Sequence, residues 1–163
     1  GTMIIMEALE CCVRMARHCE PAQREPLIDQ VWLLGAAVHR DFDLTQAISQ
    51  TRIMINLHSK RDVAHLKWGT TIFGSADGVY DACAGYRRFR GPGCDAPNLY
   101  QVQYQKSWRS FGYHGGHVSV LSRRFARHVI APQIIALADG EDLPPAWIRK
   151  HERNTQHNDA AYG

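Results

Sequence analysis

The stretch VWLLGAAV, residues 31–38, is apolar at every position and compatible with a β-strand. A strand with one exposed face alternates apolar and polar residues, whereas a strand that is buried on both faces is a continuous apolar run. Parallel sheets that are covered by helices produce this second pattern. We therefore predict a strand over residues 31–38 and a fold of the α/β class.

Further strands and helices alternate along the chain around this stretch. The residues RIMINLHS (52–59) and LYQVQYQ (99–105) predict two more strands. Helices are predicted over residues 3–19, 44–50, 62–73 and 118–130, and the last is expected to kink or restart at Pro132 and to continue to Leu137. This alternation predicts a mostly parallel sheet in a three-layer α-β-α arrangement.

Two later segments have patterns of their own. Residues 74–98 are rich in Gly, Asp and Pro, which predicts a long loop. In the last predicted helix, Leu121, Phe125 and Val129 recur at a spacing of four, so we expect all three to face the core.

The length of 163 residues is that of one ordinary domain. We predict a single domain over residues 1–140, followed by a polar C-terminal tail over residues 141–163. Three strands make a thin sheet for this architecture, and the chain opens on Gly-Thr-Met. We therefore expect the domain to be incomplete at its N-terminus.

Composition argues against several functional classes. A net charge of +3 is too weak to indicate nucleic-acid binding, and no apolar run reaches the length of a membrane span. The five cysteines are odd in number and contain no Cys-x-x-Cys motif, which favours reduced thiols and a cytoplasmic location.

Polar residues follow each predicted strand, where sites form in open parallel sheets. Asp41 and Asp43 follow the first strand and Asp62 follows the second, while His114 and His117 follow the third within FGYHGGHV (111–118). A carboxylate beside an imidazole holds one tautomer and stabilises its protonated form, as a general base requires. The glycines around the histidines would let this loop bend back over the sheet.

The segments INLHSKRDVAHL (55–66) and GYHGGHVSVLSRRF (112–125) resemble the acid and histidine regions of the α/β-hydrolase superfamily. The family's chain order is nucleophile, acid, histidine. The resemblance implies the C-terminal part of an α/β-hydrolase fold and a serine-type esterase or related acyl hydrolase. It implies that His117 is the general base and Asp62 its orienting acid, with His114, Asp41 and Asp43 as the less favoured choices.

The Gly-x-Ser-x-Gly nucleophile motif of that family does not occur in these 163 residues. The resemblance places the serine two residues before Gly1, in a missing N-terminal half of the same domain, so we expect the isolated chain to be inactive. It implies a small-molecule acyl substrate and no cofactor. Tyr80, Tyr86 and Phe89, from the loop 74–98, are expected to line the substrate pocket.

Each of these residues also has a simpler interpretation. Asp62 could cap the helix that follows it, a role compatible with catalysis, and His117 could be an N-terminal helix residue. His114 and His117 have a His-x-x-His spacing that His58, His65 and Asp62 could complete as a metal site. Because no established zinc motif accompanies them, we expect no metal.

A second hypothesis is a non-enzymatic α/β domain that binds a partner or an anionic ligand. It rests on a segment between Asp95 and Asp139 that contains no acidic residue. The basic residues in and just before this segment are Arg87, Arg88, Arg90, Lys106, Arg109, Arg123, Arg124 and Arg127. A solvated helix face is the simpler explanation for such a cluster.

Overall fold

The computed structural model describes residues 8, 26–62, 83–143 and 147. Three parallel strands form its sheet in the order β1-β2-β3, with β1 at Ile28–Leu34, β2 at Thr51–His58 and β3 at Leu99–Gln103. The predicted parallel sheet of an α/β fold is thus confirmed. The predicted helices over residues 3–19 and 62–73 and the tail 141–163 lie largely or wholly outside the described residues.

Strand β1 covers a different range from the one predicted. It begins at Ile28 and ends at Leu34, because Gly35 has a φ of 72° and turns the chain out of the sheet. Val38 is nevertheless fully buried, and its carbonyl accepts a hydrogen bond of 2.9 Å from the Ala84 amide. Residues 35–38 therefore lie beyond the strand and are still apolar, because the segment around Ala84 packs on them.

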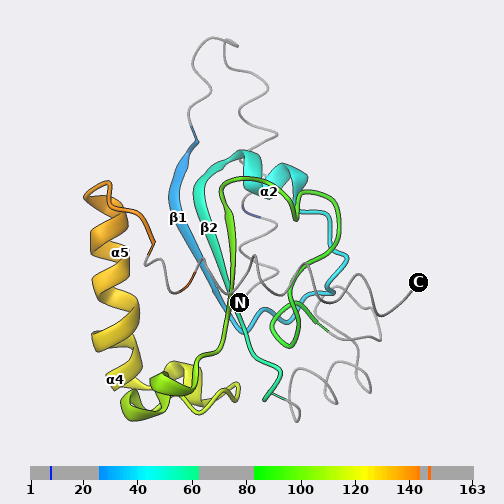
Figure 1. Cartoon of the computed structure of the whole chain (residues 1–163). Coiled ribbons are helices and arrows are strands. Elements are labelled where there is room, and N and C mark those ends of the chain that lie inside the picture. Colours follow the sequence, from blue (N-terminus) through cyan, green and yellow to red (C-terminus); the bar gives the residue numbers. More distant parts are fainter. Residues whose placement is uncertain (1–7, 9–25, 63–82, 144–146, 148–163) are drawn as a thin grey trace.

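Apolar side chains pack on both faces of the sheet. One cluster contains Leu33, Met54 and Leu99, together with Ala47 and Ile48 from α2 (Thr45–Ser49). The other contains Ile55 and Val102, and residues from the last helical segment pack against it. Strand β2 lies between its two neighbours (Figure 1) and is buried from Met54 to His58, so it is the strand with two buried faces.

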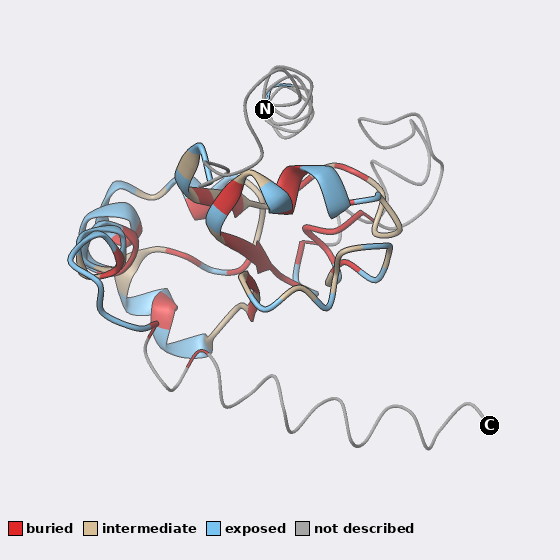
Figure 2. Cartoon of the chain, turned by 90° about the horizontal axis from the view of Figure 1, so that it is seen from above, coloured by how far each residue is buried: buried red, intermediate tan, exposed pale blue. Residues whose placement is uncertain are grey.

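The last helical segment consists of α4 (Arg123–Phe125), a π-helical stretch at Ala126–Ile130 and α5 (Ala131–Ala138). It runs beside β1 in the direction opposite to the strands (Figure 1). Its inner residues Phe125, Val129 and Leu137 are buried, whereas its outer side is exposed (Figure 2).

The start of this segment corrects one prediction. Leu121 is 74 % exposed and does not share the core face with Phe125 and Val129. It belongs to a short 3-10 turn, Ser119–Leu121, and the extended backbone at Ser122 separates this turn from α4. The helical spacing therefore does not reach back to Leu121.

Pro132 lies inside the continuous helical segment. A proline lacks the amide hydrogen, and its ring would clash with the carbonyl group four residues earlier in a regular α-helix. The π-helical stretch directly precedes it, and such stretches widen the helix locally. The helix therefore continues through Pro132 to Ala138.

Candidate active site

The first part of the site is the turn that follows β2. The Asp62 amide donates to the Ser59 carbonyl oxygen at 3.1 Å, and the Arg61 amide donates to Ser59 Oγ at 3.2 Å. These bonds close a tight turn at the carboxyl edge of the sheet, which lies at the bottom of Figure 1. The Asp62 side chain is buried there, with 4 % of its surface exposed.

The second part is the loop that follows the 3-10 helix η3 (Lys106–Phe111) after β3. Gly112 ends η3 with a φ of 85°, and Gly115 has a φ of 90°. A Cβ atom at Gly115 would lie 2.9 Å from Ser59 Oγ and 3.0 Å from Arg61. The loop thus packs directly on the Ser59–Asp62 turn, and this contact is possible because residue 115 has no side chain.

This packing brings the predicted acid and histidine together. Nδ1 of His117 lies 3.5 Å from Oδ2 of Asp62. The Asp62 carboxylate is buried, whereas the His117 side chain is 39 % exposed. A carboxylate at Nδ1 orients the ring and stabilises its protonated form, which leaves proton transfer with a reacting group to Nε2. The arrangement can therefore serve as an oriented general base that is accessible from solvent.

Two residues that the sequence did not single out support this pair. Tyr113 is almost fully buried, and its phenol lies close to the Ser59 side chain. Burial, followed by the nearby charge of Asp62, raises the pKa of the Tyr113 phenol above its ordinary value. Tyr113 therefore remains a neutral hydroxyl next to the carboxylate. Its place beside His114 in FGYHGGHV was the one sequence signal that could have identified it.

Tyr113 is part of an aromatic cluster beneath the loop. Its ring stacks on Trp108 at 5.9 Å and meets Tyr104 edge-on at 5.1 Å, and Phe125 packs at 4.6 Å. The guanidinium carbon of Arg61 lies 6.0 Å from the Tyr104 ring centroid. This cluster ties the His117 loop to β3 and to the last helical segment.

The less favoured candidates have other neighbours. His114 is exposed, and its amide donates to Ser119 Oγ at 3.2 Å. Asp41 pairs with Arg90, with Nη2 to Oδ2 at 2.6 Å, and this pairing lowers the Asp41 pKa below its ordinary value. Asp43 accepts a hydrogen bond of 2.8 Å from the Thr45 amide, at the start of α2, and its pKa is also lowered by Thr45.

The residues expected to line a pocket are placed as follows. Phe89 is 1 % exposed and packs in the core cluster with Leu33, so its ring lies in the interior. Tyr86 is buried beside Cys83, and Tyr80 lies outside the described residues. The lining of a substrate pocket by these three residues stays a prediction.

No group of three or more His, Cys, Asp or Glu side chains in the described part of the chain is arranged to hold a metal ion. His58 is buried at the end of β2, and His65 lies outside the described residues. No helix among those that the structure describes is long and apolar enough to cross a membrane.

Comparison with models of known protein families, with curated proteins and with solved structures finds no match to this chain.

Proposed function

We propose that Asp62 and His117 are the acid and the histidine of a serine-type hydrolase of the α/β-hydrolase type. The observation that supports this most directly is the 3.5 Å separation between Nδ1 of His117 and the buried carboxylate of Asp62. The two residues follow neighbouring parallel strands in the order acid, then histidine, which is the family's order. Apolar clusters on both faces of the sheet fit the three-layer α-β-α arrangement that the proposal requires.

In the proposed mechanism, Nε2 of His117 accepts the hydroxyl proton of a serine as the serine oxygen attacks the acyl carbon of an ester. The same nitrogen then gives the proton to the oxygen of the alcohol as its bond to the acyl carbon breaks, which leaves the acyl group on the serine. A water molecule that Nε2 deprotonates then attacks this acyl-serine, so that the acid leaves and the proton returns to the serine oxygen. Asp62 holds the ring through Nδ1 and stabilises its positive charge in this step. The serine would lie outside the 163 residues, and the substrate would be a small-molecule ester or a related acyl compound.

The coding sequence before Gly1 provides the first test. The proposal expects an open reading frame that encodes a strand followed by Gly-x-Ser-x immediately before Gly1. A stop codon or a ribosome-binding site directly before Met3 would contradict the proposed nucleophile.

The second test is hydrolysis of p-nitrophenyl esters by the protein expressed from its full reading frame. We expect the His117→Ala variant to lose about 10⁴-fold or more in kcat and the Asp62→Asn variant about 10⁴-fold. The matched control is His114→Ala, which removes an exposed imidazole from the same loop and should leave kcat unchanged. Circular dichroism shows whether each variant keeps the fold.

Two outcomes would contradict the assignment. A His117→Ala enzyme that retains its rate removes His117 from the mechanism. Loss of activity in His114→Ala alone would show that the wrong ring had been chosen.

A further inference from the structure

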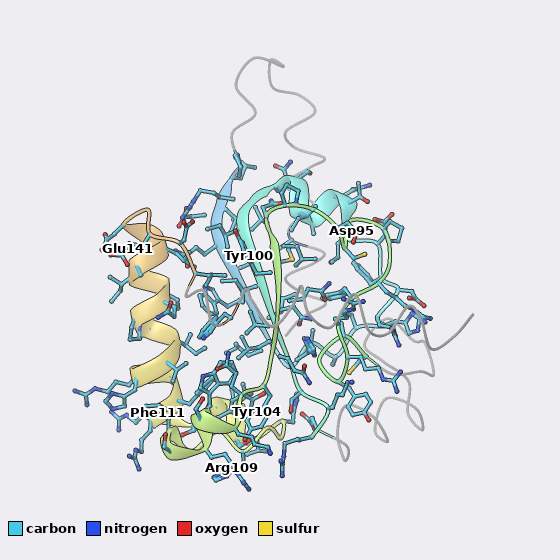
Figure 3. The ribbon with its side chains drawn as sticks, viewed as in Figure 1. Asp95, Tyr100, Tyr104, Arg109, Phe111 and Glu141 are labelled. Atoms are coloured by element: carbon cyan, nitrogen blue, oxygen red, sulfur yellow. The ribbon has the colours of Figure 1, made fainter. Side chains whose placement is uncertain are left out.

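Five exposed basic side chains and two exposed aliphatic side chains come from the segments at the carboxyl edge of the sheet and the start of the last helical segment. We call this the 106–127 surface; it comprises Lys106, Arg109, Val118, Leu121, Arg123, Arg124 and Arg127. Val118 is 69 % and Leu121 74 % exposed, and all five basic residues are exposed. Arg109 points away from the sheet at the bottom of Figure 3.

Contacts between the elements bring this set together. The helix η3 packs against α4 and against the π-helical stretch. Ser122 Oγ donates to the Phe111 carbonyl oxygen at 2.9 Å, and the Phe111 ring stacks on His128 at 5.8 Å. Lys106 and Arg109 are three residues apart on a 3-10 helix and therefore lie on the same side of it.

The charges are placed against the helix dipole. Arg123, Arg124 and Arg127 lie near the amino end of the last helical segment, where its dipole disfavours cations. Asp139 and Glu141 lie at its carboxyl end, where the dipole disfavours anions, and Glu141 is far from Arg109 in Figure 3. Helix stability therefore does not account for this distribution, which gathers basic side chains of the described residues at the amino end of the segment and acidic ones at its carboxyl end.

We propose that the 106–127 surface docks peripherally on an anionic lipid bilayer. Basic side chains are attracted to anionic headgroups, and exposed aliphatic side chains gain free energy by entering the boundary between headgroups and acyl chains. The phosphates of a nucleic acid would pair with the basic side chains but would make no apolar contact with Val118 and Leu121. A second copy of the chain would bring two positive surfaces face to face, which repel each other.

The test is sedimentation of the protein, expressed from its full reading frame, with vesicles. We expect binding to vesicles of equimolar phosphatidylcholine and phosphatidylglycerol, little binding to phosphatidylcholine alone, and weaker binding as salt is added. The Arg124→Ala variant should bind about fivefold more weakly, because each basic residue near an anionic surface contributes about that factor. The matched control, Arg87→Ala, removes an exposed arginine outside the surface and should bind normally.

The aliphatic part of the proposal has its own control. Leu121→Asp should weaken binding at least about tenfold. Ile135→Asp should not weaken it, although Ile135 is 62 % exposed, because Ile135 lies in α5 and outside the 106–127 surface. Asp62→Asn should bind like the unaltered protein, so that binding is judged separately from the proposed hydrolysis.

Several results would overturn the proposal. These are equal binding to neutral and anionic vesicles, no binding to either, or equal effects of Leu121→Asp and Ile135→Asp. Binding to duplex DNA that requires Arg124 but not Leu121, without vesicle binding, would identify a nucleic-acid surface instead.

Discussion

Gly115 is the residue at which the two halves of the candidate site meet. Its φ of 90° is unfavourable for residues with a side chain, and a Cβ atom would collide with Ser59 Oγ and Arg61. Gly116, the next residue, has no positive φ, and the nearest atom to a Cβ there would be 3.9 Å away. Position 115 therefore requires a glycine, whereas position 116 has room for a side chain.

We expect Gly115→Ala to destabilise the protein by about 1–3 kcal/mol, from backbone strain together with the displaced turn. Gly116→Ala should change the free energy of unfolding by well under that amount. Urea denaturation measures both values. Equal effects of the two substitutions would show that the loop does not pack on the Ser59–Asp62 turn as described.

Tyr113 makes the stability of the protein sensitive to alkaline pH. Its pKa is raised in the folded protein, so above pH 10 the unfolded chain loses a proton that the folded protein keeps. The stabilisation is fully present below pH 10 and is lost progressively as the pH rises towards the folded-state pKa.

Tyr113→Phe should therefore show a shallower loss of stability above pH 10 than the unaltered protein, because phenylalanine has no proton to lose. Urea midpoints measured from pH 8 to pH 11 test this. Parallel curves for Tyr113→Phe and the unaltered protein would contradict the expectation.

At the scale of elements, buried amide side chains attach the loop after residue 83 to the sheet. The Gln101 side chain on β3 accepts from the Phe89 amide and donates to the Phe89 carbonyl oxygen at 3.1 Å. Asn56 on β2 donates to the Ala84 carbonyl oxygen, also at 3.1 Å. Each amide side chain thus binds a backbone group of the loop, which is not part of any strand.

Gln101→Leu would leave the Phe89 amide and carbonyl buried without this partner, at a cost of about 1–3 kcal/mol for each unsatisfied group. Gln103→Leu, two residues along the same strand at a partly exposed position, should cost far less. Chemical denaturation compares the two variants. A Gln101→Leu protein as stable as Gln103→Leu would show that the loop is not held in this way.

At the scale of the whole molecule, β2 is the only strand with a neighbour on each side among the described residues. Amide hydrogens of β2 should therefore exchange slowest with solvent, and in β1 and β3 only those that point towards β2 should be protected. Hydrogen exchange followed by NMR measures this. Uniform protection along β1 would instead indicate a further strand beside it.

The three strands and the helix between the first two could be predicted from the sequence, because strand composition and helical spacing are local patterns. Parallel strands share a carboxyl edge, so Asp62 and His117, each placed after a strand, could be expected at the same edge. Their proposed roles in catalysis stay predictions.

How these residues meet, and which of the others are buried, depends on contacts between segments that are distant in the chain. Gly115 packs on Ser59, and Nδ1 of His117 lies beside Asp62; both contacts join segments more than fifty residues apart. Leu121 is exposed because the helix begins two residues after it, and Phe89 is buried because Gln101 holds its backbone against the sheet. These outcomes depend on which distant segment provides a partner, and local spacing does not contain that information.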